Sequence, residues 1–180
     1  MEDLHAKVKS ERSVLEKIMG YIPLYHGYKE KELRRESDKI LRNFIFQNLN
    51  ESTQNLKKTQ TELVDSNKIK FAQNLDKTIT KCDTVAQRIN RAESGYSGFW
   101  DATKINENDL DKLYELDEGI AELSFGTKES TREFLTSSKS IESENTFNPL
   151  ENKISYSLER IEDQLSKRHA LLHGFGEMNV

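Results

Sequence analysis

The chain has 180 residues, a length typical of one folded domain, and we expect residues 1–180 to form a single helical domain. Hydrophobic residues make up 34% and charged residues 32%, so the core must be thin, as in a bundle of long helices that each bury a narrow stripe. The net charge of −4 gives no general attraction to nucleic acid or anionic lipid, so nucleic acid is not an expected partner.

The sequence shows no membrane-spanning or targeting segment. No apolar run approaches the roughly 20 residues that a membrane-spanning helix needs, and the first residues contain no apolar run that could serve as a signal peptide. The lone cysteine, Cys82, lies on the apolar face of a predicted helix and indicates a small core residue in a reducing compartment. We therefore expect a cytoplasmic protein.

A short amphipathic helix is predicted over residues 2–19. Gly20 ends it, and Pro23 and Gly27 prevent the following residues from continuing a helix. This connector nevertheless carries several tyrosines and aliphatic residues. A connector this apolar is expected to pack against another part of the protein.

A long apolar stripe predicts a second helix over residues 29–65. Its last members, Leu49, Leu56 and Leu63, are seven residues apart, which is the spacing of a coiled-coil seam. Another stripe predicts a third helix over residues 67–93. The polar residues between the two stripes favour a turn, so we predict an antiparallel hairpin in which the stripes bury each other. One continuous helix over residues 29–93 is the alternative.

Two further helices are predicted in the C-terminal half. One covers residues 106–125 and continues to residue 141 if the following Ser/Thr-rich tract is helical. The other covers residues 149–173, because Asn148 suits the N-cap and Pro149 the first helical position. No segment alternates with the period of a strand. The sequence therefore predicts an all-α fold, in which a long, coiled-coil-like antiparallel hairpin and its flanking helices form an elongated three- to four-helix bundle.

The seam formed by Leu49, Leu56 and Leu63 extends farther than the shorter third helix would cover. An uncovered apolar seam favours association. We therefore expect a protein partner at the tip of the hairpin, either a different protein or a second copy of the chain in a homo-oligomer.

Two sequence signatures carry a family resemblance. Residues 27–36 read Gly-Tyr-Lys-Glu-Lys-Glu-Leu-Arg-Arg-Glu, and residues 95–101 read Gly-Tyr-Ser-Gly-Phe-Trp-Asp. With these signatures the chain resembles an uncharacterised family of small prokaryotic helical proteins, mainly over residues 21–120. Where this chain has Trp100, the family has a second Phe. The resemblance implies that the two glycine-aromatic connectors belong to one common design, and it implies no reaction.

Metal binding is one hypothesis for His169 and His173, whose spacing of four residues places two imidazoles on one face of a helix. The motif lacks the glutamate that metalloprotease helices carry beside the first histidine, and no third ligand is evident. Two solvated histidines near a helix C-terminus are the simpler interpretation. The sequence contains no glycine-rich phosphate loop, and the stripe position of Cys82 predicts burial rather than reactivity. We therefore expect no catalytic residue and no cofactor.

The charged segment at residues 29–42 allows two interpretations. Glu30 with Arg34, and Asp38 with Arg42, place the acid four residues before the base, as in surface ion pairs on a helix. The alternative is a basic spot that docks an acidic side chain of the same chain. That spot would consist of Lys31, Arg34 and Arg35, and its acidic partner would be Asp101, Asp109 or Asp111.

Aromatic residues in the two connectors form the main candidate contact surface, which we term the aromatic end. A hairpin over residues 29–93 would bring both connectors to the end opposite its turn. We predict that they form one cluster with Arg34 or Arg35 beside it and Asp101 within salt-bridge reach. The cluster is either a hydrophobic plug or a protein-binding surface, for which Tyr, Trp and Arg are the enriched residue types. Its aromatic members are Tyr25, Tyr28, Tyr96, Phe99 and Trp100.

The sequence as a whole favours a non-enzymatic helical interaction or scaffold protein of unknown pathway. One alternative is a peripheral membrane-surface or envelope-stress component whose apolar connectors contact lipid headgroups. The other alternative is a metal-binding protein or enzyme that uses His169 and His173.

Overall fold

The computed structural model describes residues 31–91 and 107–174, and these residues are almost entirely helical. The elements are α2 (Lys31–Asp65), α3 (Ile69–Arg91), α5 (Glu107–Ser137), the short 3₁₀ helix η2 (Ser138–Ser140) and α6 (Glu144–Gly174). No strand occurs within the two described ranges, so the predicted all-α fold is confirmed. The helix predicted over residues 2–19 lies outside the described residues.

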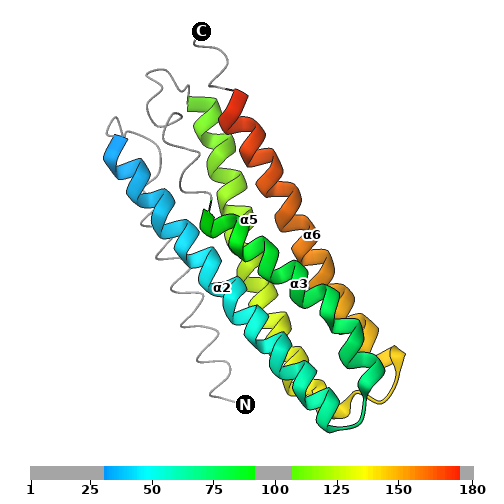
Figure 1. The fold of residues 1–180 in the computed structure, drawn as a ribbon. Helices are drawn as coiled ribbons and strands as arrows, with labels where there is room; N and C mark the ends of the chain where they lie inside the picture. Colours follow the sequence, from blue (N-terminus) through cyan, green and yellow to red (C-terminus); the bar gives the residue numbers. More distant parts are fainter. Residues whose placement is uncertain (1–30, 92–106, 175–180) are drawn as a thin grey trace, which may run out of the picture.

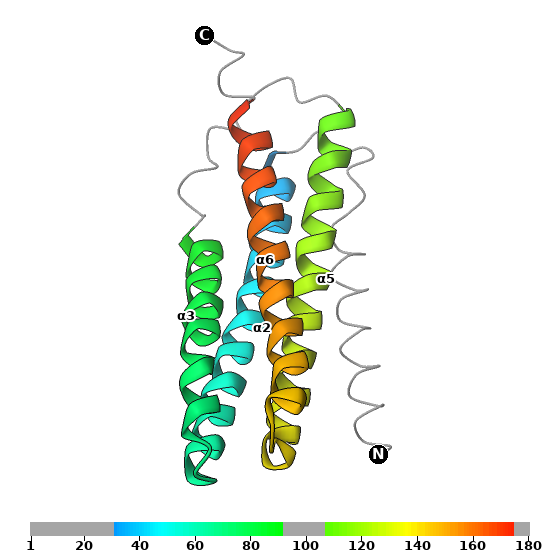
Figure 2. The same ribbon diagram turned by 90° about the vertical axis from the view of Figure 1, so that its right-hand side faces the viewer.

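The helices form two antiparallel hairpins, α2–α3 and α5–α6, which lie side by side in an elongated bundle (Figures 1 and 2). α2 packs mainly on α3 and α5, and α6 packs mainly on α5 and α3. Both turns lie at the same end of the bundle, so α2 runs parallel to α5 (Figure 1). Lys68 Nζ, beside the first turn, donates a hydrogen bond to the carbonyl oxygen of Lys139 at 3.0 Å. The predicted hairpin with flanking helices is therefore confirmed.

The turn between α2 and α3 excludes one continuous helix over residues 29–93. Asn67 has a φ of 58°, a left-handed conformation that asparagine tolerates better than most residues. The N–H of Lys68 donates to the carbonyl of Leu63 at 2.8 Å, and the N–H of Asn67 donates to the carbonyl of Val64 at 2.9 Å. These two bonds are the pattern of a Schellman cap, which satisfies the last carbonyls of α2. The predicted turn thus has a local cause in the sequence.

The predicted apolar stripes line the core. The whole stripe predicted for α3 is buried except Phe71, which is half-buried. Leu49, Leu56 and Leu63 are each 0% exposed in a single chain. This burial removes the reason for expecting a partner at the hairpin tip, because α5 of the same chain, as well as α3, packs on α2. The apolar stripe predicted for residues 29–65 also included Ile40, which is 40% exposed, so that part of the prediction was wrong.

α5 continues through much of the Ser/Thr-rich tract to Ser137. Its hydroxyls bond to the preceding turn of their own helix: Thr127 donates to the carbonyl of Leu123 at 2.7 Å, and Thr131 donates to that of Lys128 at 2.8 Å. These bonds satisfy the hydroxyls without an external partner, so they can be buried inside a helix. The predicted continuation is confirmed as far as Ser137, after which η2 replaces the α-helix.

α6 begins at Glu144, so the predicted start at Asn148 and Pro149 was wrong. The N–H of Ser143 donates to Oγ1 of Thr146 at 3.3 Å, and the N–H of Phe147 donates to the carbonyl of Ser143 at 3.1 Å. This arrangement resembles a capping box and starts the helix five residues earlier. Pro149 lies inside the helix but near its start, where one backbone hydrogen bond is lost.

Gly126→Ala is expected to stabilise the fold by about 1 kcal/mol, which is the difference in helix propensity between the two residues. Gly126 is exposed inside α5, and an added Cβ would meet no other atom within 4 Å. Urea denaturation measures the change. Gly119→Ala is the control, because its Cβ would lie 2.8 Å from the amide of Gln164 and that side chain would have to move. An equal gain at both positions would contradict the steric difference between the two sites.

Candidate functional site

Four charged side chains meet inside the bundle, toward the end where α2 begins and α6 ends. We term them the ionic cluster: Asp38 and Arg42 of α2, Asp117 of α5 and Arg168 of α6. Arg168 donates from Nε to Oδ1 of Asp117 at 2.5 Å and from Nη2 to Oδ1 of Asp38 at 2.7 Å. Arg42 donates from Nε to the other oxygen of Asp38 at 2.8 Å. One guanidinium thus joins three helices.

The ionic cluster is shielded from solvent. Asp38, Asp117 and Arg168 are each 4% exposed, whereas Arg42 is partly exposed. Two carboxylates face two guanidiniums, so the opposite charges are balanced. Burial raises the pKa of the Asp117 carboxyl above its ordinary value, while the Arg168 guanidinium acts against that rise. A buried charge of either sign requires its partners, so the members of the cluster depend on one another.

The sequence predicted only part of this cluster. Asp38 and Arg42 form the expected pair, but Asp38 is buried, so its interpretation as a surface ion pair was wrong. The reason is Arg168, which reaches Asp38 from a helix far along the chain. Arg168 lies seven residues after the buried Ile161, on the core-facing side of α6. This spacing was the signal in the sequence that Arg168 is buried.

A second set of polar contacts joins the parallel helices α2 and α5. Asn48 Nδ2 donates to Oγ of Ser124 at 3.2 Å, and Asn55 Nδ2 donates to Oγ1 of Thr131 at 3.3 Å. One heptad further on, the Ser138 hydroxyl donates to the Glu62 carboxylate. We term these three pairs the polar ladder. Because the pairs recur every seven residues, they run along one edge of the interface between α2 and α5.

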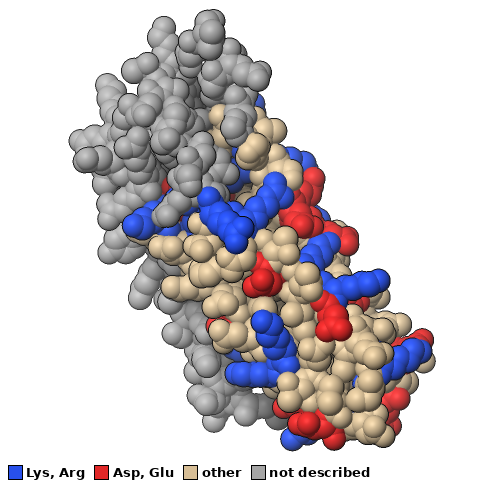
Figure 3. All heavy atoms as spheres, in the orientation of Figure 1, with Lys and Arg blue, Asp and Glu red and all other residues tan. Residues whose placement is uncertain are grey.

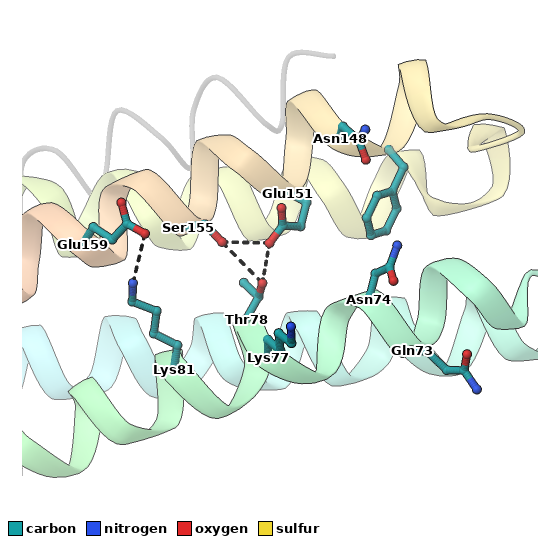
Figure 4. A pocket seen from close by; sticks show the side chains of 10 residues that line it. Gln73, Asn74, Lys77, Thr78, Lys81, Asn148, Glu151, Ser155 and Glu159 are labelled. Atoms are coloured by element: carbon teal, nitrogen blue, oxygen red, sulfur yellow. Dashed lines mark hydrogen bonds and ion pairs between the residues drawn. The ribbon is translucent and has the colours of Figure 1, made fainter.

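An open groove of about 410 Å³ lies between α3 and α6 (Figure 4). Thr78 points across it and donates to Oε1 of Glu151 at 2.5 Å, and Ser155 donates to the same oxygen at 2.7 Å. Farther along the groove, Lys81 Nζ lies 3.3 Å from Oε1 of Glu159. The polar groups that cross the groove thus bond to one another and hold α3 against α6.

Most residues predicted for the aromatic end lie outside the described residues. Lys31, Arg34 and Arg35 lie in the first turns of α2, and the structure describes no contact of their side chains. Asp111 is exposed on α5, and the docking of the basic spot on an acidic side chain stays a prediction. The predicted positions outside the described ranges are Tyr25, Tyr28, Tyr96, Phe99, Trp100 and Asp101.

The two histidines of the metal-binding hypothesis lie near the end of α6. His169 is exposed on α6, and His173 lies in the last turn of the same helix. No group of three histidine, cysteine, aspartate or glutamate side chains that could hold a metal ion occurs among the described residues.

The described helices carry charged side chains of both signs on the surface of the bundle. Basic and acidic side chains are interspersed on the face shown in Figure 3. Ion pairs also join α3 and α6, such as Lys70 with Glu144 at 2.6 Å. None of the described helices is apolar enough over sufficient length to cross a membrane.

Comparison of the chain with protein-family models, curated proteins and solved structures finds no match. The family resemblance of the two glycine-aromatic signatures therefore stays a prediction.

Arg168→Met is expected to destabilise the fold by about 3–5 kcal/mol, because it leaves the Asp38 and Asp117 carboxylates buried without their shared partner. Urea denaturation followed by circular dichroism measures the loss. Lys167→Met is the matched control, since Lys167 pairs with Asp163 on the surface and both side chains are more than half exposed. A loss as small as that of the control would show that the ionic cluster is not buried as described.

The thiol of Cys82 is expected to stay unreactive in the folded protein. Cys82 is 0% exposed and donates to the carbonyl of Leu49 at 3.4 Å, and burial raises the pKa of the thiol from 9.0 to about 11. At pH 8 the folded chain should therefore not react with a thiol-specific disulfide reagent, whereas the chain in urea should react with one equivalent. Rapid reaction of the folded chain would contradict burial.

Proposed function

We propose that the protein is a non-enzymatic, cytoplasmic interaction or scaffold protein that binds a protein partner through its aromatic end. The single observation that supports this proposal is the position of the ionic cluster. Arg168 joins α2, α5 and α6 toward the end of the bundle where α2 and α5 begin. Residues 27–30 lead into α2 and residues 92–106 lead into α5, so both signature connectors enter helices that the cluster holds together.

Helices that the ionic cluster holds together provide a rigid support for a contact surface. Holding the attachment points in place reduces the conformational entropy that is lost when a partner binds. The aromatic residues of the connectors, and Arg34 and Arg35 in the first turns of α2, are of the types that dominate binding energy in protein interfaces. The proposal thus combines a rigid base with side chains suited to recognition.

Trp100→Ala distinguishes a contact surface from a hydrophobic plug. If Trp100 contacts the partner, affinity capture from the native host should lose a specific co-purifying protein while the melting temperature stays unchanged. Quantitative mass spectrometry measures the captured proteins, and thermal denaturation measures stability.

Tyr156→Ala is the matched control, because Tyr156 is an aromatic side chain on α6 that is 59% exposed and contacts only Arg160 in the interactions described. The control should retain every captured protein. A lower melting temperature for Trp100→Ala, with the same captured proteins as wild type, would identify the aromatic end as a plug and contradict the proposed function.

A further inference from the structure

Buried positions recur every seventh residue on all four described helices. Such a repeat makes successive layers of a bundle alike, as in coiled coils. One hairpin could therefore move along the other by seven residues, about 10 Å, and still place core positions opposite core positions. The repeats are Leu49, Leu56 and Leu63 in α2; Leu75, Cys82 and Ile89 in α3; Ile120, Thr127 and Phe134 in α5; and Phe147, Ile154 and Ile161 in α6.

Two of the three pairs of the polar ladder, those of Asn48 and Asn55, do not distinguish these two registers. If the α5–α6 hairpin moved by seven residues toward the start of α2, Asn48 would face Thr131 and Asn55 would face Ser138. Each amide would again meet a hydroxyl. On the other side of the bundle Thr78 would face Glu144 in place of Glu151, so it would again meet a carboxylate.

The ionic cluster does distinguish the registers. Arg168 is the next member of the α6 repeat after Ile161, and it is the point where that repeat changes from apolar to charged. In the displaced register Ile161 would take the place of Arg168, and Asp38 would lose its bond from α6. A buried carboxylate that loses such a partner is strongly disfavoured.

We propose that the ionic cluster is a register lock, which selects one of the two hairpin registers that the seven-residue repeat permits. The lock acts through the energetic penalty on the displaced register rather than through net stabilisation of the native one. Replacement of a complete buried ionic group by apolar side chains of similar size is often neutral or stabilising. This inference is independent of the proposed function.

The test removes the whole cluster and measures the register directly. The variant carries Asp38→Leu, Arg42→Gln, Asp117→Leu and Arg168→Met. Spin labels are placed at the exposed positions Asn43 of α2 and Glu142 beyond η2, in a Cys82→Ala background. Counting along parallel helices places these sites about 35 Å apart in the native register and about 25 Å apart in the displaced one.

Pulsed electron paramagnetic resonance should give one distance near 35 Å for the labelled protein with an intact cluster. The cluster-free variant should stay folded and should add a second population near 25 Å. A matched control variant with Lys81→Gln, Glu159→Gln and Glu162→Gln removes ion pairs between the same hairpins on the surface, and it should keep the single native distance.

Two outcomes would overturn the proposal. A folded cluster-free variant with only the native distance would assign the register to another contact between the hairpins, such as the stacking of Phe147 of α6 on Phe71 of α3, at 5.0 Å between ring centroids. A cluster-free variant that no longer folds would show that the cluster supplies stability rather than register.

Discussion

The narrow buried stripe on each helix is the constraint on which the rest of the structure depends. With hydrophobic residues at 34% of the chain, four helices cannot all fill their core-facing positions with large apolar side chains. Hydroxyl residues occupy some of these positions, and their own helix satisfies them: Ser52 donates to the carbonyl of Asn48 at 2.8 Å, and Thr59 to that of Asn55 at 2.9 Å. Small side chains bonded in this way can be buried at little cost in free energy, so the helices can still pack around a thin apolar core.

Contacts between the two hairpins divide by burial into two kinds. In the ion pair between Lys70 of α3 and Glu144 of α6 both side chains are more than half exposed, and such a pair contributes little to stability. All members of the polar ladder and the ionic cluster except Glu62 and Arg42 are buried, where an unpaired group is costly. The apolar core therefore supplies most of the free energy that holds the hairpins together, while the buried polar groups limit the relative positions in which the two hairpins can pack.

Most features with a local cause could be predicted from the sequence, whereas features with a distant cause could not. The turn near Asn67 follows from three consecutive polar residues, and the α3 stripe follows from its own spacing. The start of α6 was missed because Ser143 and Thr146, rather than the more familiar Asn-Pro pair, cap it. The burial of Asp38 depends on Arg168, which is distant in the sequence and whose side-chain direction only the assembled bundle determines. The aromatic end lies outside the described residues and stays a prediction.

The ionic cluster lies where the described bundle changes from four helices to three. The hydrogen bond from Cys82 to the carbonyl of Leu49 shows that these two residues lie side by side on the antiparallel helices α3 and α2. Because α3 ends nine residues after Cys82, its end lies beside residues 40–41 of α2, between Asp38 and Arg42. Beyond that level, α2, α5 and α6 are the described helices that continue. Within the described ranges, apolar packing at that level has one fewer helix to draw on, and apolar packing has no directional preference. A guanidinium that bonds carboxylates on two neighbouring helices fixes the distances among three helices at once, which is the requirement at a layer where the fourth helix ends.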